Sequence, residues 1–426
     1  MTYPDVLEIQ PKQPIDAVLN VPGSKSLTNR AFVIAALADG TSTLEGGLIA
    51  EDAEVMIRAL RSLGFTVEMD GTTFTVHGRG GEIPNASAEL DLKLSGTSIR
   101  FLTALVTLGK GHYLLDGNAR MRQRPIQDLL NALAPLGVKV GTQFETGCPP
   151  VVVEAAGLAG GETRIAGQSS SQYLSALLMA APGAANPVTI GLEGELTSKP
   201  FIDMTLDLMK AFGVEVEREG YKRFTVQPQT YGPRTYRVEG DAMAAGYMWA
   251  AAAITGGRVR VENVGRRSSQ GDRRLADVLG EMGCAVTWGE ESCEVAAPEA
   301  GLKGGTFDLN DMSDQAQTLA VVALFAQSPV RITNIWNLRI KETDRLRALY
   351  NELSKLGAEV EEGEDFIVVH PLATPPSQRV KIETYDDHRM AMAFALAGLK
   401  LPGVVIKDPS CVRKTFPEFF DVLAAL

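Results

Sequence analysis

The sequence predicts an α/β protein of two domains, each built from three copies of one repeat. Three observations lead to this prediction. The chain has 426 residues, too many for one ordinary hydrophobic core. A helical segment with the pattern Leu-Gly-x-x-Val, or a close variant, recurs at intervals of 70 to 76 residues, with its glycine at Gly64, Gly137, Gly213, Gly283 and Gly357. Ala-rich apolar segments, each followed by a short strand-like run, lie between these copies.

The segment that ends at each of these glycines is amphipathic. In the fifth copy, Leu346, Leu349, Leu353 and Leu356 recur at close to the helical period. Such a segment packs one face on a core, so we expect an outer helix. Two short runs typical of strands follow each copy, for example 73–77 and 366–370.

The Ala-rich segments are apolar on nearly every face, which predicts fully buried helices. With their following strands, the six copies span residues 30–46, 100–117, 173–191, 246–263, 318–334 and 390–408. The sixth repeat reaches the C-terminus at Leu426 without its closing strands, and residues 6–9 and 17–21 have the pattern of such strands. We therefore expect an N-terminal domain of residues 23–239 and a C-terminal domain of residues 1–22 plus 240–426, closed by the N-terminal strands.

Composition narrows the classes of partner. The net charge of −11 disfavours a nucleic-acid partner. No apolar run approaches the ~18 residues that cross a membrane, and the N-terminus lacks signal-peptide character, so a cytoplasmic protein is expected. The four cysteines form no CxxC pair and the four histidines show no ligand spacing, so we expect no metal, no cofactor and no disulfide framework. We expect a monomer.

Cations recur where helices are predicted to start, although a helix N-terminus disfavours positive charge. These cations are Lys25, Arg124, Lys199, Lys341, Arg345, Arg389 and Lys414, accompanied by Ser26, Gly96-Thr97, Ser170-Ser171 and Ser198. Helix N-termini, cations and hydroxyls together form anion sites. Because the pattern occurs in both predicted domains, we expect the active site in the cleft between them. Taken singly, each cation could be a solvated surface charge, and Ser26, Thr97 and Ser198 could be N-caps.

Four motifs carry a resemblance to a known family: 21–37 (VPGSKSLTNRAFVIAAL), 340–349 (IKETDRLRAL), 386–396 (DDHRMAMAFAL) and 408–420 (DPSCVRKTFPEFF). In this order they resemble the enolpyruvyl transferases, and most closely the branch that acts on shikimate 3-phosphate. The resemblance implies two domains, each of three βαβαββ units around buried parallel helices. It also implies transfer of the enolpyruvyl group of phosphoenolpyruvate to the 5-hydroxyl of shikimate 3-phosphate, with release of phosphate.

The resemblance also implies residue roles. Phosphoenolpyruvate contacts would come from Lys25, Gly96, Arg124, Gln172, Arg345, Arg389 and Lys414. Shikimate 3-phosphate contacts would come from Lys25, Ser26, Arg30, Ser170, Ser171, Gln172, Ser198, Asp314, Asn337 and Lys341.

Proton transfer needs a positioned base and a positioned acid. The resemblance gives the base role to Asp314 and the acid role to Glu342, with Lys25 as a competing proton donor. By its sequence alone Asp314 could instead cap the following helix, and Glu342 could be a first-turn residue that complements the helix dipole. His388 could orient or relay protons, or be structural.

The chain departs from the family pattern at three places. It has Leu94-Ser95 where Asn-Ala is common, Phe101 where Pro is common and Phe201 where Tyr is common. The first two flank Gly96, so they bear on binding of glyphosate, which occupies the phosphoenolpyruvate site in this family. Two alternatives remain: a UDP-N-acetylglucosamine enolpyruvyl transferase and a catalytically silent anion-binding protein on the same fold. The first is disfavoured because the loop 117–125 lacks the Cys usual in that family.

Overall fold

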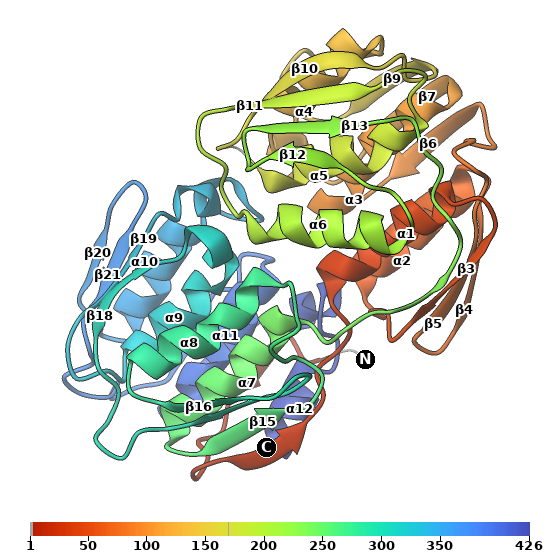
Figure 1. Ribbon diagram of the computed structural model, residues 1–426. Helices are drawn as coiled ribbons and strands as arrows, with labels where there is room; N and C mark the ends of the chain where they lie inside the picture. The colour runs from red at the N-terminus through yellow and green to blue at the C-terminus, as the bar shows by residue number, and fades with distance from the viewer. Residues whose placement is uncertain (1–2, 169) are drawn as a thin grey trace. The chain divides into compact units, whose positions relative to one another are not determined.

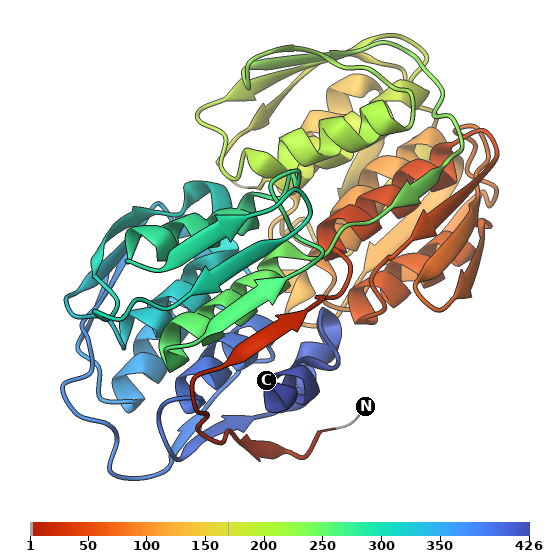
Figure 2. The same ribbon diagram turned by 60° about the horizontal axis from the view of Figure 1, so that its bottom comes forward.

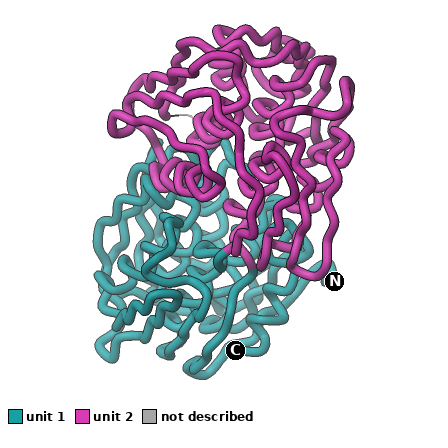
Figure 3. Tube along the Cα trace, turned by 45° about the vertical axis from the view of Figure 1, so that its right-hand side comes forward, with its two compact units in different colours: residues 1–22, 239–426 teal, residues 23–238 magenta. Residues whose placement is uncertain are grey.

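The computed structural model describes residues 3–168 and 170–426. The chain divides into two compact units: unit 1 comprises Met1–Pro22 and Glu239–Leu426, and unit 2 comprises Gly23–Val238 (Figure 3). The chain passes from unit 1 into unit 2 after Pro22 and returns after Val238. Each unit has its own large hydrophobic core.

Unit 2 contains three buried helices, α1 (Lys25–Leu37), α3 (Gly96–Leu105) and α5 (Ser171–Ala180). Its outer helices are α2 (Glu51–Ser62), α4 (Gln127–Leu133) and α6 (Pro200–Ala211). Its strands are β3 (Thr41–Glu45), β4 (Thr66–Asp70), β5 (Thr73–His77), β6 (Ser87–Asp91), β7 (Lys110–Asp116), β8 (Lys139–Thr142), β9 (Val151–Ala156), β10 (Gly161–Ala166), β11 (Val188–Glu193), β12 (Glu217–Glu219), β13 (Arg223–Val226) and β14 (Thr235–Arg237). They form sheets ordered β14-β3-β5-β4, β6-β7-β9-β8 and β10-β11-β13-β12 (Figure 1).

Unit 1 repeats this plan. Its buried helices are α7 (Ala242–Thr255), α9 (Ala316–Ala323) and α11 (His388–Gly398), and its other helices are α8 (Leu275–Glu281), α10 (Arg345–Lys355) and α12 (Phe419–Ala425). Its strands are β1 (Val6–Glu8), β2 (Asp16–Leu19), β15 (Arg258–Val261), β16 (Ala285–Trp288), β17 (Cys293–Ala296), β18 (Gly305–Asp308), β19 (Val330–Thr333), β20 (Val360–Glu362), β21 (Ile367–Val369), β22 (Val380–Ile382) and β23 (Val404–Lys407). The sheets are ordered β16-β17-β15-β2, β18-β19-β21-β20 and β1-β23-β22.

One repeat shows how sequence pattern becomes structure. In the second repeat, β6 and β7 pair in parallel across the buried helix α3, and β8 and β9 form an antiparallel hairpin after the outer helix α4. Parallel neighbours require such a crossover, whereas an antiparallel pair needs only a turn. The predicted burial is confirmed: every residue of α7 is buried, whereas α10 buries only one face, which includes Leu346, Leu349 and Leu353.

The N-terminal strands do not both complete the sixth repeat, as the sequence led us to expect. β1 does so, pairing antiparallel with β23. β2 instead pairs in parallel with β15 of the fourth repeat, and β14 takes the equivalent place beside β3 of the first repeat (Figure 2). The reason is that β2 and β14 each immediately precede a passage of the chain between units. Each remains in the sheet of the unit that the chain is leaving.

Among the described residues, no helix has the combined length and hydrophobicity needed to cross a membrane.

Candidate active site

In unit 1, four short segments bring the predicted site residues into one ion-paired cluster. They are the 3₁₀ helix η6 (Asn310–Gln315), the start of α10 with the residues just before it, the start of α11, and the 3₁₀ helix η8 (Pro409–Lys414). Four cationic side chains there share three carboxylates: Lys341, Arg345, Arg389 and Lys414 with Asp314, Glu342 and Asp387. We call this group the unit 1 cluster.

Asp314 contacts three cations. Its Oδ1 lies 3.2 Å from Lys341 Nζ and 3.0 Å from Arg345 Nη1, and its Oδ2 lies 3.0 Å from Arg389 Nη2. The capping interpretation of Asp314 is wrong, because Gln315 occupies the N-cap position of α9 and no side chain caps that helix. The carboxylate is oriented by charge pairing rather than by a helix end.

Glu342 bridges two cations, Arg345, which also contacts Asp314, and Lys414. Its Oε2 accepts a hydrogen bond from Arg345 Nη2 at 2.9 Å, and its Oε1 accepts one from Lys414 Nζ at 2.6 Å. The first-turn interpretation of Glu342 is also wrong. Asp344 caps α10 by accepting a hydrogen bond from Arg347 N, so the helix begins at Arg345 and Glu342 precedes it.

The centre of the cluster is a fully buried ion pair that the sequence analysis did not single out. Arg345 Nε donates to Asp387 Oδ2 at 2.7 Å and Arg345 Nη2 donates to Asp387 Oδ1 at 3.2 Å. Burial alone would lower the pKa of Arg345, but Asp387, Glu342 and Asp314 raise it above its ordinary value. Asp387 also caps α11 by accepting from Arg389 N, so one carboxylate positions two arginines. The sequence could have identified Asp387 as a site residue, because it stands in the DDHR motif at 386–389.

Two more predicted residues lie close to this cluster. His388 is buried in the first turn of α11, and its Nδ1 lies 3.7 Å from Asp387 Oδ1. Asn337 donates from Nδ2 to Ser313 Oγ at 2.9 Å, next to Asp314 in the chain.

In unit 2, a second group gathers at the N-terminal ends of α3 and α5. Gln172 Oε1 accepts from Arg100 Nη1 at 2.7 Å, and Gln172 Nε2 donates to Thr97 Oγ1 at 3.3 Å. A Cβ added to Gly96 would lie 2.8 Å from Arg100 Nη1 and from both Nη atoms of Arg124. Glycine at position 96 therefore lets two buried guanidinium groups approach the backbone. Arg100 was missed by the sequence analysis, although it stands directly before Phe101 in the chain.

The remaining cations of unit 2 have different environments. Lys25, in the first turn of α1, lies 3.5 Å from Asp52 Oδ2 through its Nζ. Arg30 is 1% exposed and donates to neutral oxygens, among them Thr205 Oγ1 at 2.7 Å. Burial lowers the pKa of Arg30 to about 9. Phe101 and Phe201, two of the residues that depart from the family pattern, lie beside this guanidinium. Their ring centroids are 5.1 and 5.7 Å from Arg30 Cζ.

The hydroxyl residues divide into caps and others. Ser170 caps α5 by accepting from Gln172 N, and Ser171 is the buried first residue of that helix. The capping interpretation is wrong for Ser26 and Thr97, because Ser24 caps α1 and Ser95 caps α3. It is wrong for Ser198 too, since Lys199 occupies the N-cap position of α6; Ser198 has a left-handed backbone, with φ of 57°.

The prediction that the cations lie at helix starts is only partly correct. Lys25, Lys199, Arg345 and Arg389 do lie at the starts of α-helices. Arg124 and Lys341 precede their helices by more than one residue, and Lys414 ends η8. Lys341 and Lys414 nevertheless reach the unit 1 cluster, because ion pairs across loops position them instead of helix ends.

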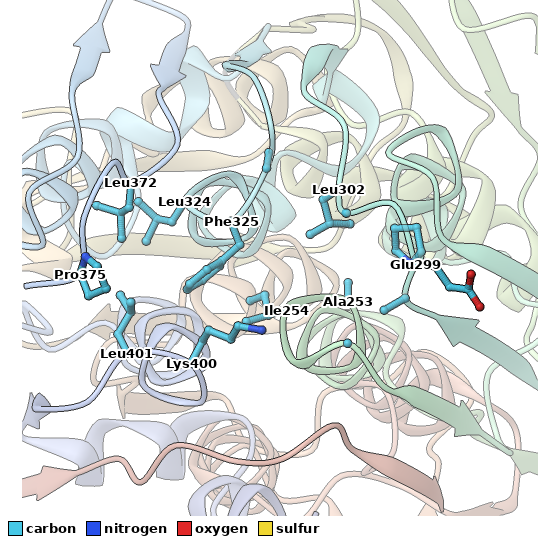
Figure 4. A pocket seen from close by; sticks show the side chains of 15 residues that line it. Ala253, Ile254, Glu299, Leu302, Leu324, Phe325, Leu372, Pro375, Lys400 and Leu401 are labelled. Atoms are coloured by element: carbon cyan, nitrogen blue, oxygen red, sulfur yellow. The ribbon is translucent and has the colours of Figure 1, made fainter.

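A separate hollow lies elsewhere in unit 1, where α7, α9 and α11 end. It has a volume of about 500 Å³, and Phe325, Leu372 and Leu401 line it, with Lys400 extending over it (Figure 4). Unit 2 has a comparable hollow of about 410 Å³ that includes Leu37 and Leu108, from the ends of its own buried helices. The recurrence identifies both hollows as products of packing three repeats, away from the charged helix starts.

Comparison with known proteins gives a consistent result over the whole chain. The family model for EPSP synthase (3-phosphoshikimate 1-carboxyvinyltransferase) matches residues 9–423. A 3-phosphoshikimate 1-carboxyvinyltransferase from Shewanella amazonensis is 47% identical over 427 residues, covering 99% of each chain. One from Trichormus variabilis is 47% identical over 411 residues, covering 96% of each. The solved EPSP synthase from Acinetobacter baumannii superposes with a TM-score of 0.81 at 26% identity, covering 99% of this chain and 98% of its own.

Proposed function

This chain belongs to the EPSP synthase family, and we infer from that membership that it transfers the carboxyvinyl group of phosphoenolpyruvate to the 5-hydroxyl of shikimate 3-phosphate. The structural observation that best supports this function is the unit 1 cluster, where Asp314 and Glu342 are held among four cations. Such an arrangement suits an enzyme that binds anionic substrates and transfers protons. The two alternatives, a UDP-N-acetylglucosamine transferase and a silent anion-binding protein, are not favoured.

The reaction is an addition followed by an elimination. The 5-hydroxyl oxygen bonds to C2 of phosphoenolpyruvate while its proton passes to a base and the methylene carbon gains a proton. The bond from C2 to the phosphate oxygen then breaks, phosphate leaves, and the new methyl group returns a proton to restore the carbon–carbon double bond. The residues must therefore supply a base, an acid and a site for the developing negative charge.

We assign the base to Asp314 because of its contacts. Its two oxygens hold Lys341, Arg345 and Arg389. A phosphate or carboxylate group of a substrate competes with Asp314 for these same donors. Binding of the anion then frees a carboxylate oxygen, which can accept the hydroxyl proton. Substrate binding and exposure of the base are thus one event in this proposal.

The acid is Glu342, with Lys25 as the competing donor. Glu342 is held by Arg345 and Lys414, so its position depends on the same cations that bind anions. Arg124, Arg345, Arg389 and Lys414 stabilise the charge of the leaving phosphate, and preorganised charge of this kind is usually the largest catalytic contribution. His388 orients or relays protons beside Asp387.

The group around Gly96 supplies the remaining phosphoenolpyruvate contacts through Arg124 and Gln172, with Arg100 as their neighbour. The shikimate 3-phosphate contacts of unit 2 come from Lys25, Ser26, Arg30, Ser170, Ser171, Gln172 and Ser198. Asn337 and Lys341 add contacts from unit 1.

Glyphosate competes with phosphoenolpyruvate at the Gly96 group. We expect its affinity to be lower than in relatives with Asn and Pro near this loop, because Phe101 replaces Pro in the helix that begins at Gly96 and so changes how that helix packs.

The test is phosphate release from phosphoenolpyruvate in the purified protein. We expect release only when shikimate 3-phosphate is also present, and no effect of EDTA. Turnover with UDP-N-acetylglucosamine in its place would refute the acceptor assignment. Absence of release with any acceptor would support the silent anion-binding alternative.

A further inference from the structure

The backbone immediately before α11 is strained. Tyr385 and Asp386 both adopt left-handed conformations, with φ of 57° and 53°. Non-glycine residues rarely adopt this region, and each such residue costs on the order of 1 kcal/mol or more unless its surroundings hold it. The next three residues are Asp387 and Arg389, which belong to the unit 1 cluster, and His388, which lies close to it. Whatever holds the strained pair therefore also sets the position of these three side chains.

One buried carboxylate accepts two hydrogen bonds from this segment. Glu352, on α10, is completely buried, and its Oε1 accepts a hydrogen bond from Tyr385 Oη at 2.6 Å. Its Oε2 accepts one from Glu383 N at 3.0 Å. Lys355 contacts both oxygens, at 2.8 and 2.7 Å, and so pairs the buried charge. A buried carboxylate is costly unless it is paired and hydrogen-bonded in this way.

Helix α10 therefore binds segment 383–387 at two points. Arg345 binds Asp387 at the first turn, and Glu352 binds residues 383 and 385 two turns later on the same helix. A spacing of seven residues places both side chains on one face of a helix. Two anchors on one rigid element fix both the position and the direction of the strained segment between them.

We propose that Glu352 and Tyr385 form a positioning latch that holds segment 383–387 in the conformation that places Asp387 against Arg345 and Arg389 against Asp314. Neither residue touches substrate; both act through the backbone. The inference rests on the proposed function for its kinetic readout, and on the geometry alone for its structural readout. A merely stabilising role would change the melting temperature without selectively changing substrate affinity.

Two substitutions at position 385 separate the parts of the latch. Tyr385→Phe removes only the hydroxyl of a side chain that is 38% exposed, so the fold should persist. It leaves the left-handed backbone at position 385 without the hydrogen bond to Glu352. Tyr385→Asn also removes the hydroxyl, but Asn tolerates the left-handed region. Tyr350→Phe, on the same helix and outside the latch, is the matched control.

We expect Tyr385→Phe to raise the KM for phosphoenolpyruvate about threefold to tenfold, the range for one lost hydrogen bond of ordinary strength, with kcat within about twofold. Hydrogen exchange of the amides of 385–389 should be faster in this variant. Tyr385→Asn should show a smaller change in both measurements, and Tyr350→Phe none.

Two results would overturn the latch. One is a Tyr385→Phe variant with unchanged KM and unchanged exchange. The other is a Tyr385→Asn variant at least as impaired as Tyr385→Phe, since the strain would then not matter. If the wild-type protein released no phosphate, the proposed function would fail, whereas the exchange comparison would still decide the latch.

Discussion

Asp272 offers a test of how the protein tolerates a carboxyl group among the cluster's charges. It lies in the 3₁₀ helix η5 (Gly271–Arg274), is 6% exposed, and its Oδ1 finds no hydrogen-bond partner among the described residues. Burial, reinforced by the charge of Asp314, raises the pKa of Asp272 to about 7, while Arg389 and Lys341 act in the opposite direction. The perturbation is Asp272→Asn, which mimics the protonated acid and cannot ionise.

The raised pKa fixes the sign and size of the effect. Between about pH 4 and pH 7 the unfolded chain has released this proton and the folded protein has kept it, so folding stability falls as pH rises across that window. Above about pH 7 the folded protein has released the proton as well, and the fall in folding stability is complete. A rise from 3.8 to about 7 corresponds to about 4 kcal/mol, of which roughly 1.5 kcal/mol is already lost at pH 5. The stability gained by Asp272→Asn should therefore be about 2–3 kcal/mol larger at pH 8 than at pH 5.

Calorimetric melting at both pH values measures this difference. For a unit of this size, the extra stabilisation at pH 8 corresponds to roughly 5–10 °C in melting temperature. Asp311→Asn is the matched control, because Asp311 is a partly exposed carboxylate on the neighbouring segment η6, paired with Arg274. A gain for Asp272→Asn that is the same at pH 5 and pH 8 would refute the reasoning, since a group that does not titrate in the fold has no such pH dependence.

Other predictions concern the proposed reaction and its inhibitor. Asp314→Asn and Glu342→Gln should each lower kcat by roughly 10²–10⁴-fold with the fold intact, as expected for lost proton transfer; near-normal turnover would remove that residue from the mechanism. Gly96→Ala should weaken glyphosate inhibition and raise the KM for phosphoenolpyruvate, because a methyl group there would lie 2.8 Å from the guanidinium groups of Arg100 and Arg124. Phe101→Pro should tighten glyphosate inhibition, and an unchanged inhibition constant would contradict the packing argument.

Local sequence pattern determined the repeat, the fold class and the burial of the helices. Periodicity is a property of neighbouring residues, so the all-apolar run of α7 and the one-sided pattern of α10 could be interpreted without knowing their partners. The motifs also determined most of the candidate site, because Glu342, Arg345 and Arg389 stand in segments that resemble a known family. The comparisons confirm that resemblance.

Only the tertiary structure decided which groups meet. Strand partners depend on residues far apart in the chain, so nothing near β2 could reveal that it pairs with β15, more than 200 residues away. The same holds for the ion pairs. Asp387 lies 42 residues beyond Arg345, and their contact arises because α10 and α11 both pack against α9 in one unit. A local pattern can identify a residue's chemistry, but its partner in space is set by the packing of the whole unit.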